Sequence, residues 1–261
     1  MRLLGTAATG IRAQQDALDT LGNNMANVET PGFKANQMDF AEALSTVVRS
    51  GNANPGGTTG GNLSVGSGVL YNAIGTDFQQ GVLAPTSRPL DLGINGNGFF
   101  QVQLADGTTG YTRVGAMQVN GTGQLTDLRG NVVQPNISIP TGATDLAVAA
   151  NGDLSGTVNG ATKTLGQISL AGFQNPEGLQ NQGDNIFIPS ANSGAPQVGL
   201  PGTTSGNLVL GTVRGQSLEQ SNVNLATSMV DLIQVQRAYQ LNANMVSNAD
   251  QMWSLANSIR R

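Results

Sequence analysis

The chain has 261 residues, and none of them is histidine or cysteine. Without histidine there is no imidazole to act as a general base, orient a nucleophile or ligate a metal. Without cysteine there is no disulfide, no thiolate nucleophile and none of the common zinc sites. These absences exclude most familiar catalytic and metal-binding arrangements. We therefore predict no catalytic residues, no cofactor and no bound metal.

Charged and aromatic residues are also scarce, at 11% and 4% of the chain, and the formal net charge is −4. Twelve scattered basic residues do not form the basic patch of a nucleic-acid-binding protein. Apolar runs such as residues 146–150 are far shorter than the roughly 20 residues of a membrane-spanning helix. Gly5, Thr6 and Thr9 interrupt the apolar N-terminus, so we expect neither a membrane-integral protein nor a cleaved secretory signal.

Glycine, by contrast, is abundant, with 36 residues but no collagen-like triplet period, which indicates many tight turns. The glycines lie mostly in the middle of the chain, and the last 46 residues contain none. This distribution predicts an α+β fold in which terminal helices flank a mainly antiparallel β domain. The expected parts are a helical segment at 1–48 that packs with a long helix at 217–261, a linker or extended hairpin at 49–84, and a central β domain at 85–216.

The N-terminal segment carries an apolar stripe with spacings of three, four or seven residues, which is typical of an amphipathic helix. The stripe consists of Ala7, Ile11, Leu18, Leu21, Met25 and Val28. Pro31-Gly32 cannot continue a helix, so the helix should end near residues 27–30. Residues 33–48 should then form a short amphipathic or extended piece.

The C-terminal segment predicts a helix from Leu225 to Ile259, about 50 Å long at ~1.5 Å per residue, with Ser221 or Asn222 as its N-cap. Its apolar stripe consists of Leu225, Met229, Leu232, Tyr239, Ala243, Val246 and Trp253. Much of the opposite face is polar but uncharged. A helix of this kind is marginal alone in water and gains stability by packing. We interpret the two helices as an intramolecular hairpin that leaves room for further packing between chains.

The middle of the chain contains short stretches in which apolar and polar residues alternate. Residues 100–104 alternate, residues 105–107 offer a hairpin turn, and a second strand follows from Tyr111. Further strands are predicted at 145–149, 167–170 and 185–188. Short strands at this spacing indicate an antiparallel sandwich or an irregular barrel. Residues 50–68 are expected to form a flexible loop or a long hairpin extension.

Catalytic motifs are mostly missing: no dinucleotide-binding or P-loop glycine pattern is present. Paired carboxylates could still serve a glycosidase, and the candidates are Asp106, Asp127, Asp145, Asp153, Glu177 and Asp184. Most of them lie beside glycine in predicted turns, where an aspartate caps the local backbone, and this structural interpretation is favoured. An exported carbohydrate-active enzyme therefore remains one hypothesis, and an adhesin or filament protein is another.

Several strings in the sequence resemble the bacterial flagellar rod and hook family. Residues 23–34, Asn-Asn-Met-Ala-Asn-Val-Glu-Thr-Pro-Gly-Phe-Lys, are similar to its N-terminal signature, and residues 220–226 and 231–239 to its C-terminal signature. The segments that resemble its central β domain are residues 90–92, 96–100, 111–113, 183–187 and 193–196. The resemblance spans nearly the whole chain in the same order.

This resemblance implies a structural subunit that assembles helically with copies of itself. Terminal helices would line a central tube, the β domain would form an outer layer, and the shaft would transmit motor torque to the hook. Chain length and the Gln236–Tyr239 run favour the distal rod, with the proximal rod and the hook as alternatives. The implied partners are other axial proteins of the proximal rod and hook, the surrounding envelope rings and the flagellar type III export apparatus. The implied location is the basal body of the flagellum.

The predicted assembly interface combines the two apolar stripes with residues of the helix-ending motif. Its N-terminal members are Ile11, Leu18, Leu21, Met25, Val28, Asn24, Asn27 and Phe33. Its C-terminal members are Leu225, Met229, Leu232, Tyr239, Ala243, Val246 and Trp253.

Overall fold

The computed structural model describes residues 2–43, 46–49, 63–66 and 68–259. The chain divides into two compact units, each made of segments far apart in the sequence. The first, which we call the helical unit, comprises Met1–Ala26, Asn36–Gly75 and Asn224–Arg261; the second, the central unit, comprises Asn27–Ala35 and Thr76–Val223. Two α-helices and many antiparallel strands occur in the described residues, so the predicted α+β class is confirmed.

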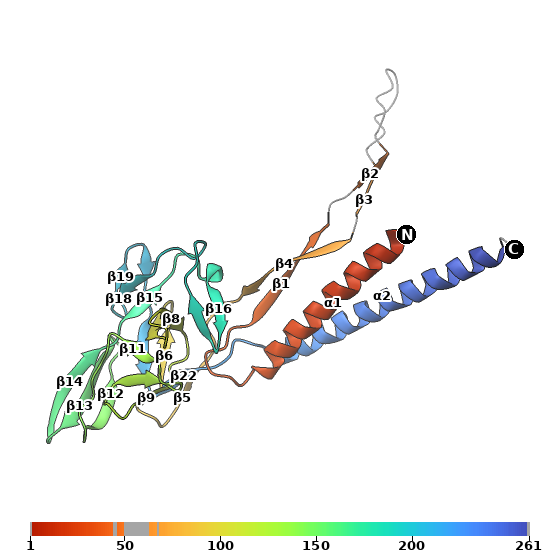
Figure 1. Cartoon of the computed structure of the whole chain (residues 1–261). Helices are drawn as coiled ribbons and strands as arrows, with labels where there is room; N and C mark the ends of the chain where they lie inside the picture. The colour runs from red at the N-terminus through yellow and green to blue at the C-terminus, as the bar shows by residue number, and fades with distance from the viewer. Residues whose placement is uncertain (1, 44–45, 50–62, 67, 260–261) are drawn as a thin grey trace, which may run out of the picture. The chain divides into compact units, whose positions relative to one another are not determined.

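In the helical unit, α1 (Arg2–Ala26) and α2 (Leu225–Ile259) pack side by side in opposite directions (Figure 1). α2 has the predicted bounds, and α1 ends just before the turn that leads to Pro31-Gly32, because proline cannot continue the helix. Small residues allow the helices to approach closely. A side chain at Gly10 would come within 3.0 Å of the Asn242 amide nitrogen.

The N-cap of α2 differs from the prediction. Asn224, not Ser221 or Asn222, caps the helix: its Oδ1 accepts hydrogen bonds from the N–H of Ala226 at 3.0 Å and of Thr227 at 3.3 Å. In the usual capping geometry, the side-chain oxygen of the N-cap residue accepts a hydrogen bond from the backbone N–H two or three residues later, as Asn224 does here. Asn222 has another role in the central unit, where it joins two chain segments.

Two β ribbons complete the helical unit. β1 (Asn36–Glu42) pairs with β4 (Val69–Thr76), and β2 (Thr46–Arg49) pairs with β3 (Leu63–Val65) (Figure 1). The segment after the first helix is therefore extended rather than helical. Residues 50–62, most of the segment predicted as a loop or hairpin extension, lie outside the described residues.

The central unit is built around a nine-stranded sheet in the order β16-β17-β8-β7-β11-β10-β9, with β15 also paired to β7 and β18 to β15. Its strands are β7 (Phe99–Gln103), β8 (Thr109–Thr112), β9 (Met117–Val119), β10 (Leu125–Asp127), β11 (Val132–Gln134), β15 (Leu170–Gly172), β16 (Gln180–Gly183), β17 (Ile186–Ile188) and β18 (Gln197–Gly199). The described pairings in this sheet are antiparallel, and short turns connect four of the eight pairs, β7–β8, β9–β10, β10–β11 and β16–β17.

The central unit also contains smaller sheets. A three-stranded sheet contains β12 (Thr144–Val148), β13 (Asp153–Val158) and β14 (Ala161–Gln167). The two-stranded pairs are β5 (Leu83–Pro85) with β22 (Ser217–Glu219), β6 (Leu92–Asn95) with β21 (Thr212–Gly215), and β19 (Thr204–Ser205) with β20 (Leu208–Val209).

The predicted strands are mostly present, with one exception. The hairpin around Asp106 is confirmed, with Gln103 paired to Thr109 across the turn. The predicted single strand at 167–170 is wrong: β14 ends at Gln167 and β15 begins at Leu170. Between them the Ile168 side chain is fully buried, and its N–H bonds to the Gly152 carbonyl at 2.8 Å, as the chain passes from one sheet to another.

The core of the central unit has two clusters. The larger consists mainly of aliphatic residues that the strands and the loops between them place inside, among them Leu92, Phe100, Met117, Leu154, Ile168 and Leu210. The smaller is aromatic, with Phe99, Phe173, Tyr111 and Phe187 buried together and ring pairs in edge-to-face geometry. This geometry suits the ring quadrupoles, so the edge-to-face pairs add to the stability of this region.

Candidate assembly surface and the buried ionic cluster

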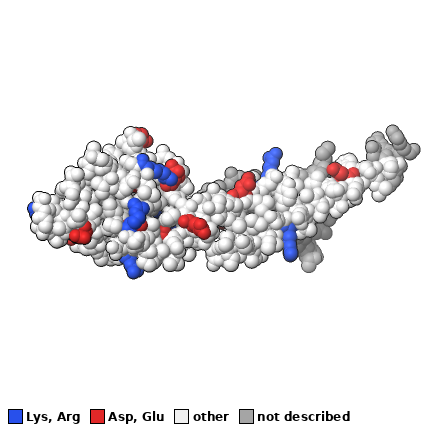
Figure 2. Space-filling view, turned by 90° about the horizontal axis from the view of Figure 1, so that it is seen from below, with Lys and Arg blue, Asp and Glu red and all other residues white. Residues whose placement is uncertain are grey.

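The long helix α2 exposes many large apolar side chains. They are Leu225, Met229, Val230, Ile233, Leu241, Met245, Met252, Trp253 and Leu255. Only Asp231, Arg237 and Asp250 are charged among its 35 residues. On the face seen in Figure 2, charged side chains are scattered over a mostly uncharged surface. Extended exposed apolar surfaces are typical of interaction sites, so α2 is the candidate assembly surface.

Part of this surface forms a stripe that the sequence analysis did not identify. Val230, Leu241, Met245, Met252 and Leu255 are separated by 11, 4, 7 and 3 residues, which places them on one side of a helix. We call these five residues the outer stripe. The 3.6-residue period is visible in the sequence, but it could not show which of two apolar faces would be covered by α1.

The predicted C-terminal interface residues fall into two groups. Leu232, Tyr239 and Val246 are half-buried and share a helix side with Asn242, which contacts Gly10 of α1. The exposed members are Leu225, Met229, Ala243 and Trp253. Within one chain, therefore, α1 partly covers the first group and leaves the second to solvent.

The predicted N-terminal residues are covered to a greater degree. The half-buried ones are Ile11, Leu18, Leu21, Met25, Val28 and Asn27. Asn24 is buried: its Oδ1 accepts from the Asn36 N–H at 2.9 Å, and its Nδ2 donates to the Asn36 carbonyl at 2.8 Å. Phe33 is buried in the central unit. Asn24 and Phe33 thus stabilise the chain itself and offer little surface to a neighbour.

The central unit also buries three charged groups in contact. The carboxylate of Glu219 on β22 accepts from Lys34 Nζ and from the Gly81 N–H at 2.9 Å through Oε1, and from Arg113 Nη1 at 3.3 Å through Oε2. Lys34 Nζ also donates to the Gln79 carbonyl at 2.7 Å. The three side chains are at most 3% exposed. We call Lys34, Arg113 and Glu219 the ionic cluster.

Backbone and amide hydrogen bonds hold the same segments together. The Gly32 N–H donates to the Glu219 carbonyl at 2.7 Å, the Ala35 N–H to Asn222 Oδ1 at 2.8 Å, and Asn222 Nδ2 to the Asp77 carbonyl at 2.8 Å. Gly32 has φ +69°, and a side chain there would lie 2.9 Å from the Val114 nitrogen. Glycine is therefore required at this turn for both conformation and space.

Burial controls the ionisation of the cluster. It lowers the pKa of Lys34, while the field of Glu219 and its hydrogen bond raise that pKa in opposition. The pKa of Arg113 is lowered for the same reason and is likewise opposed by Glu219. Removing charges from water is costly, and a buried pair is tolerable only when hydrogen bonds satisfy it. The cluster was not predicted, because Lys34 and Glu219 lie 185 positions apart and charged residues are normally exposed.

The carboxylates considered for a glycosidase include clear turn caps. Asp106 Oδ1 accepts from the Thr108 N–H and hydroxyl, and these bonds lower its pKa. Asp127 Oδ1 accepts from the N–H groups of Arg129 and Asn131 at 2.8 and 2.9 Å. For these two residues the structural interpretation is confirmed. Asp184 instead pairs with Arg129 at 2.8 Å on the surface.

Comparison with known protein families matches three segments of the chain. Residues 4–34 match the model for flagella basal body rod proteins, residues 93–156 the D1 domain of the flagellar hook proteins FlgE/F/G, and residues 214–259 the C-terminal region of the basal body rod FlgEFG proteins. Each matched segment contributes one member of the ionic cluster: Lys34, Arg113 and Glu219 respectively.

Relatives that match over nearly the full length of the chain belong to the same family. The chain is 39% identical to the flagellar basal-body rod protein FlgG of Agrobacterium fabrum, with 98% of both chains covered. It is 37% identical to FlgG of Caulobacter vibrioides over the whole of both chains, and 34% identical to FlgG of Bacillus subtilis over 97% of this chain and 96% of the relative. The chain belongs to the flagellar rod and hook family.

Membership in the rod and hook family confirms the predicted structural role. The FlgG relatives support a structural subunit of the distal rod, and rod proteins belong to the flagellum. These relatives are named as basal-body rod proteins. Among the described residues, neither α1 nor α2 combines the length and apolar character needed to cross a bilayer.

Proposed function

We propose that this chain polymerises helically with copies of itself into the hollow distal rod, which transmits motor torque to the hook. The observation that carries the proposal is the exposed apolar surface of α2 in a chain of the rod and hook family. The surface includes the outer stripe and the exposed members of the predicted stripe, such as Met229.

The energetics favour burial of this surface between copies. Burying apolar surface contributes about 25 cal/mol per Å². Leu241, Met252 and Leu255 each expose more than 60% of their surface, so a neighbour that covers them removes substantial apolar area from water. A head-to-tail contact that does not close produces an open helical filament, which is the form a shaft needs.

The same proposal names partners and location. At its two ends the rod would contact axial proteins of the proximal rod and of the hook, and around its circumference the envelope rings. The subunit would reach the basal body through the flagellar type III export apparatus. The role is mechanical and involves no catalysis, cofactor or metal.

One charge added to the outer stripe tests the proposal. Leu241→Glu places a carboxylate on the stripe, and Gln240→Glu adds the same charge at the adjacent exposed position, about 100° away around the helix. Met229→Glu tests the exposed part of the predicted stripe. We expect Leu241→Glu and Met229→Glu to lose motility and rod assembly, and Gln240→Glu to retain both.

Assembly is read by cryo-electron microscopy of basal bodies and by sedimentation of the purified chain, with circular dichroism to verify that each variant is folded. Working rods built from a folded Leu241→Glu or Met229→Glu chain would contradict the proposal.

A further inference from the structure

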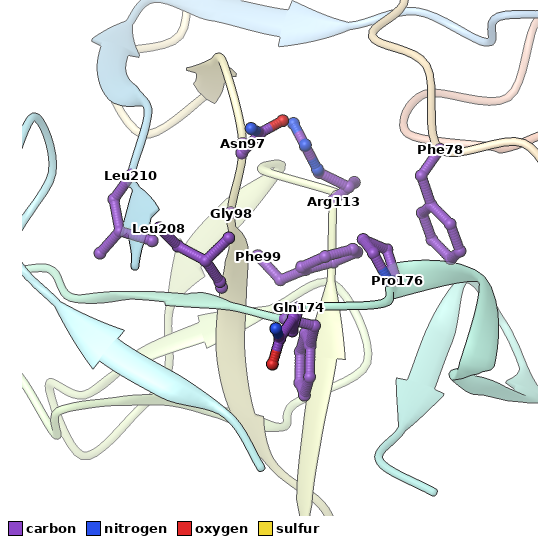
Figure 3. Close-up of a pocket in the computed structure, with 11 residues that line it drawn as sticks. Phe78, Asn97, Gly98, Phe99, Arg113, Gln174, Pro176, Leu208 and Leu210 are labelled. Carbon is purple, nitrogen blue, oxygen red and sulfur yellow. The ribbon is translucent and has the colours of Figure 1, made fainter. Parts of the chain in front are cut away.

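A small cavity lies beside the ionic cluster in the central unit. Its volume is about 180 Å³, and its walls include Arg113, Asn97, Phe99, Phe173 and Leu208. In Figure 3 the guanidinium end of Arg113 points toward the side chain of Asn97, and Leu208 approaches from the side opposite to Phe78. The cavity thus combines apolar walls with a polar end made by one cation and one amide.

Arg113, which lines this cavity, has unused hydrogen-bonding capacity. Its side chain is 3% exposed, and its Nη1 contacts Glu219 at 3.3 Å. Its Nε has no hydrogen-bond partner in the part of the chain that the structure describes. The guanidinium carbon lies 5.2 Å from the centre of the Phe99 ring, which holds the group in place. A buried donor without an acceptor is costly, so such a group points to a ligand.

The charge of the ionic cluster is also unbalanced. Two cations, Lys34 and Arg113, share the single carboxylate of Glu219. Asp77 raises the pKa of Lys34, but less than Glu219 does. A buried positive charge without a counter-charge is unfavourable in a low-dielectric interior. An anion in the cavity would correct the imbalance at Arg113.

We propose that this cavity binds a carboxylate, and that in the polymer the carboxylate belongs to an aspartate or glutamate side chain of a neighbouring copy. The second half rests on the proposed rod function. The cavity is smaller than the roughly 300–1,000 Å³ of typical small-molecule sites, which favours one side chain over a cofactor. Arg113 would make charge-assisted hydrogen bonds to the carboxylate, and Leu208 and Phe173 would pack against its methylene stem.

Charge complementarity supports a second copy as the source. Outside the ionic cluster the sequence has ten basic and fifteen acidic residues. Each copy thus presents an excess of carboxylates outside a buried positive site. The competing source is Glu177 of the same chain, an exposed residue adjacent to Pro176 on the cavity wall.

The first test uses the dilute full-length chain with propionate as the carboxylate and propionamide as its neutral counterpart. The readout is the Arg113 Nε–H resonance in ¹H–¹⁵N spectra. We expect a saturable shift with propionate and none with propionamide. Leu208→Trp, which fills the cavity, should abolish the shift, while Val209→Trp, at the neighbouring exposed position, should retain it. An unchanged resonance with propionate, or an equal shift in Leu208→Trp, would overturn the proposal.

The second test identifies the source of the carboxylate. Leu208→Trp should weaken polymerisation at least tenfold although the chain remains folded, and Val209→Trp should polymerise normally. Normal polymerisation of a folded Leu208→Trp chain would overturn the neighbouring-copy assignment. A shift of the Arg113 resonance when Glu177→Gln is introduced into the dilute chain would also overturn this assignment. The carboxylate in the cavity would then come from Glu177 of the same chain.

The two proposals fail separately. A wild-type chain that does not assemble contradicts the rod proposal, whereas a chain that assembles but shows no propionate response contradicts the cavity proposal. Leu241→Glu provides the complementary control: it should lose assembly and keep the propionate response, because the outer stripe and the cavity belong to different units.

Discussion

The two units of this chain differ in the burial of their large apolar residues. In the central unit, Leu92, Phe100 and Met117 are completely buried. Among the described residues of the helical unit, the buried apolar ones are the small Ala7, Ala13 and Ala17, while large residues of α2 face outward. The central unit thus completes a core within one chain, whereas the helical unit leaves large apolar side chains exposed. We therefore expect the central unit to fold by itself and the helical unit to gain stability from assembly.

The polar groups show the same contrast. The central unit buries an ionic cluster whose members come from three distant segments, and it satisfies most of their hydrogen bonds. The helical unit buries Asn24, and both the oxygen and the nitrogen of its side-chain amide bond to the Asn36 backbone. This is a local contact near the end of α1. Long-range polar contacts therefore hold the first and last segments of the central unit to the rest of that unit, while the long helix depends mainly on its own backbone and on packing.

The largest effect is expected from removing the single carboxylate of the ionic cluster. Glu219→Gln leaves Lys34 and Arg113 buried without a counter-charge, and breaking a buried pair in this way costs about 3–5 kcal/mol of unfolding free energy. Urea unfolding monitored by hydrogen–deuterium exchange of central-unit peptides measures it. Glu29→Gln, at an exposed position of the same unit, serves as the control. A loss below about 1 kcal/mol would show that the cluster contributes little to the central unit, against the range for a buried pair.

The same substitution in each unit sharpens the comparison directly. Met117 is completely buried and Met252 is 70% exposed, so Met117→Ala should destabilise the dilute chain by about 2–5 kcal/mol and Met252→Ala by less than about 0.5 kcal/mol. In the polymer the order should change, since Met252→Ala should weaken assembly. Denaturation of the dilute chain and sedimentation of the polymer supply the two readings. Equal destabilisation of the dilute chain by both variants would break the contrast between the units.

The smallest effect concerns the start of α2. Asn224→Ala removes the side-chain acceptor for two N–H groups and should reduce helix stability by about 1 kcal/mol. Asn244→Ala, in the exposed helix interior, should be neutral or slightly stabilising because alanine has the higher helix propensity. Thermal unfolding followed by circular dichroism compares the two. If Asn222→Ala lowered helix content more than Asn224→Ala, the cap assignment would be wrong.

Local sequence patterns predicted the elements well where local forces dominate. The bounds of α2 follow from its apolar period and lack of glycine, and the β7–β8 hairpin follows from alternation around the Asp106 turn. The break at Ile168 could not be predicted, because an alternating stretch looks the same whether the chain continues in one sheet or passes to another. Asn222 and Asn224 are likewise equivalent as capping residues until tertiary contacts engage one of them.

The sequence alone thus determined the two long helices, the glycine-rich β region and the signatures of an axial subunit. These features depend on residue periods and on backbone geometry within a few positions. The tertiary structure decided which face of α2 stays exposed and brought Lys34, Arg113 and Glu219 together beside a cavity. Burial and the pairing of charges depend on segments more than 100 positions apart, and no local pattern encodes which of them meet.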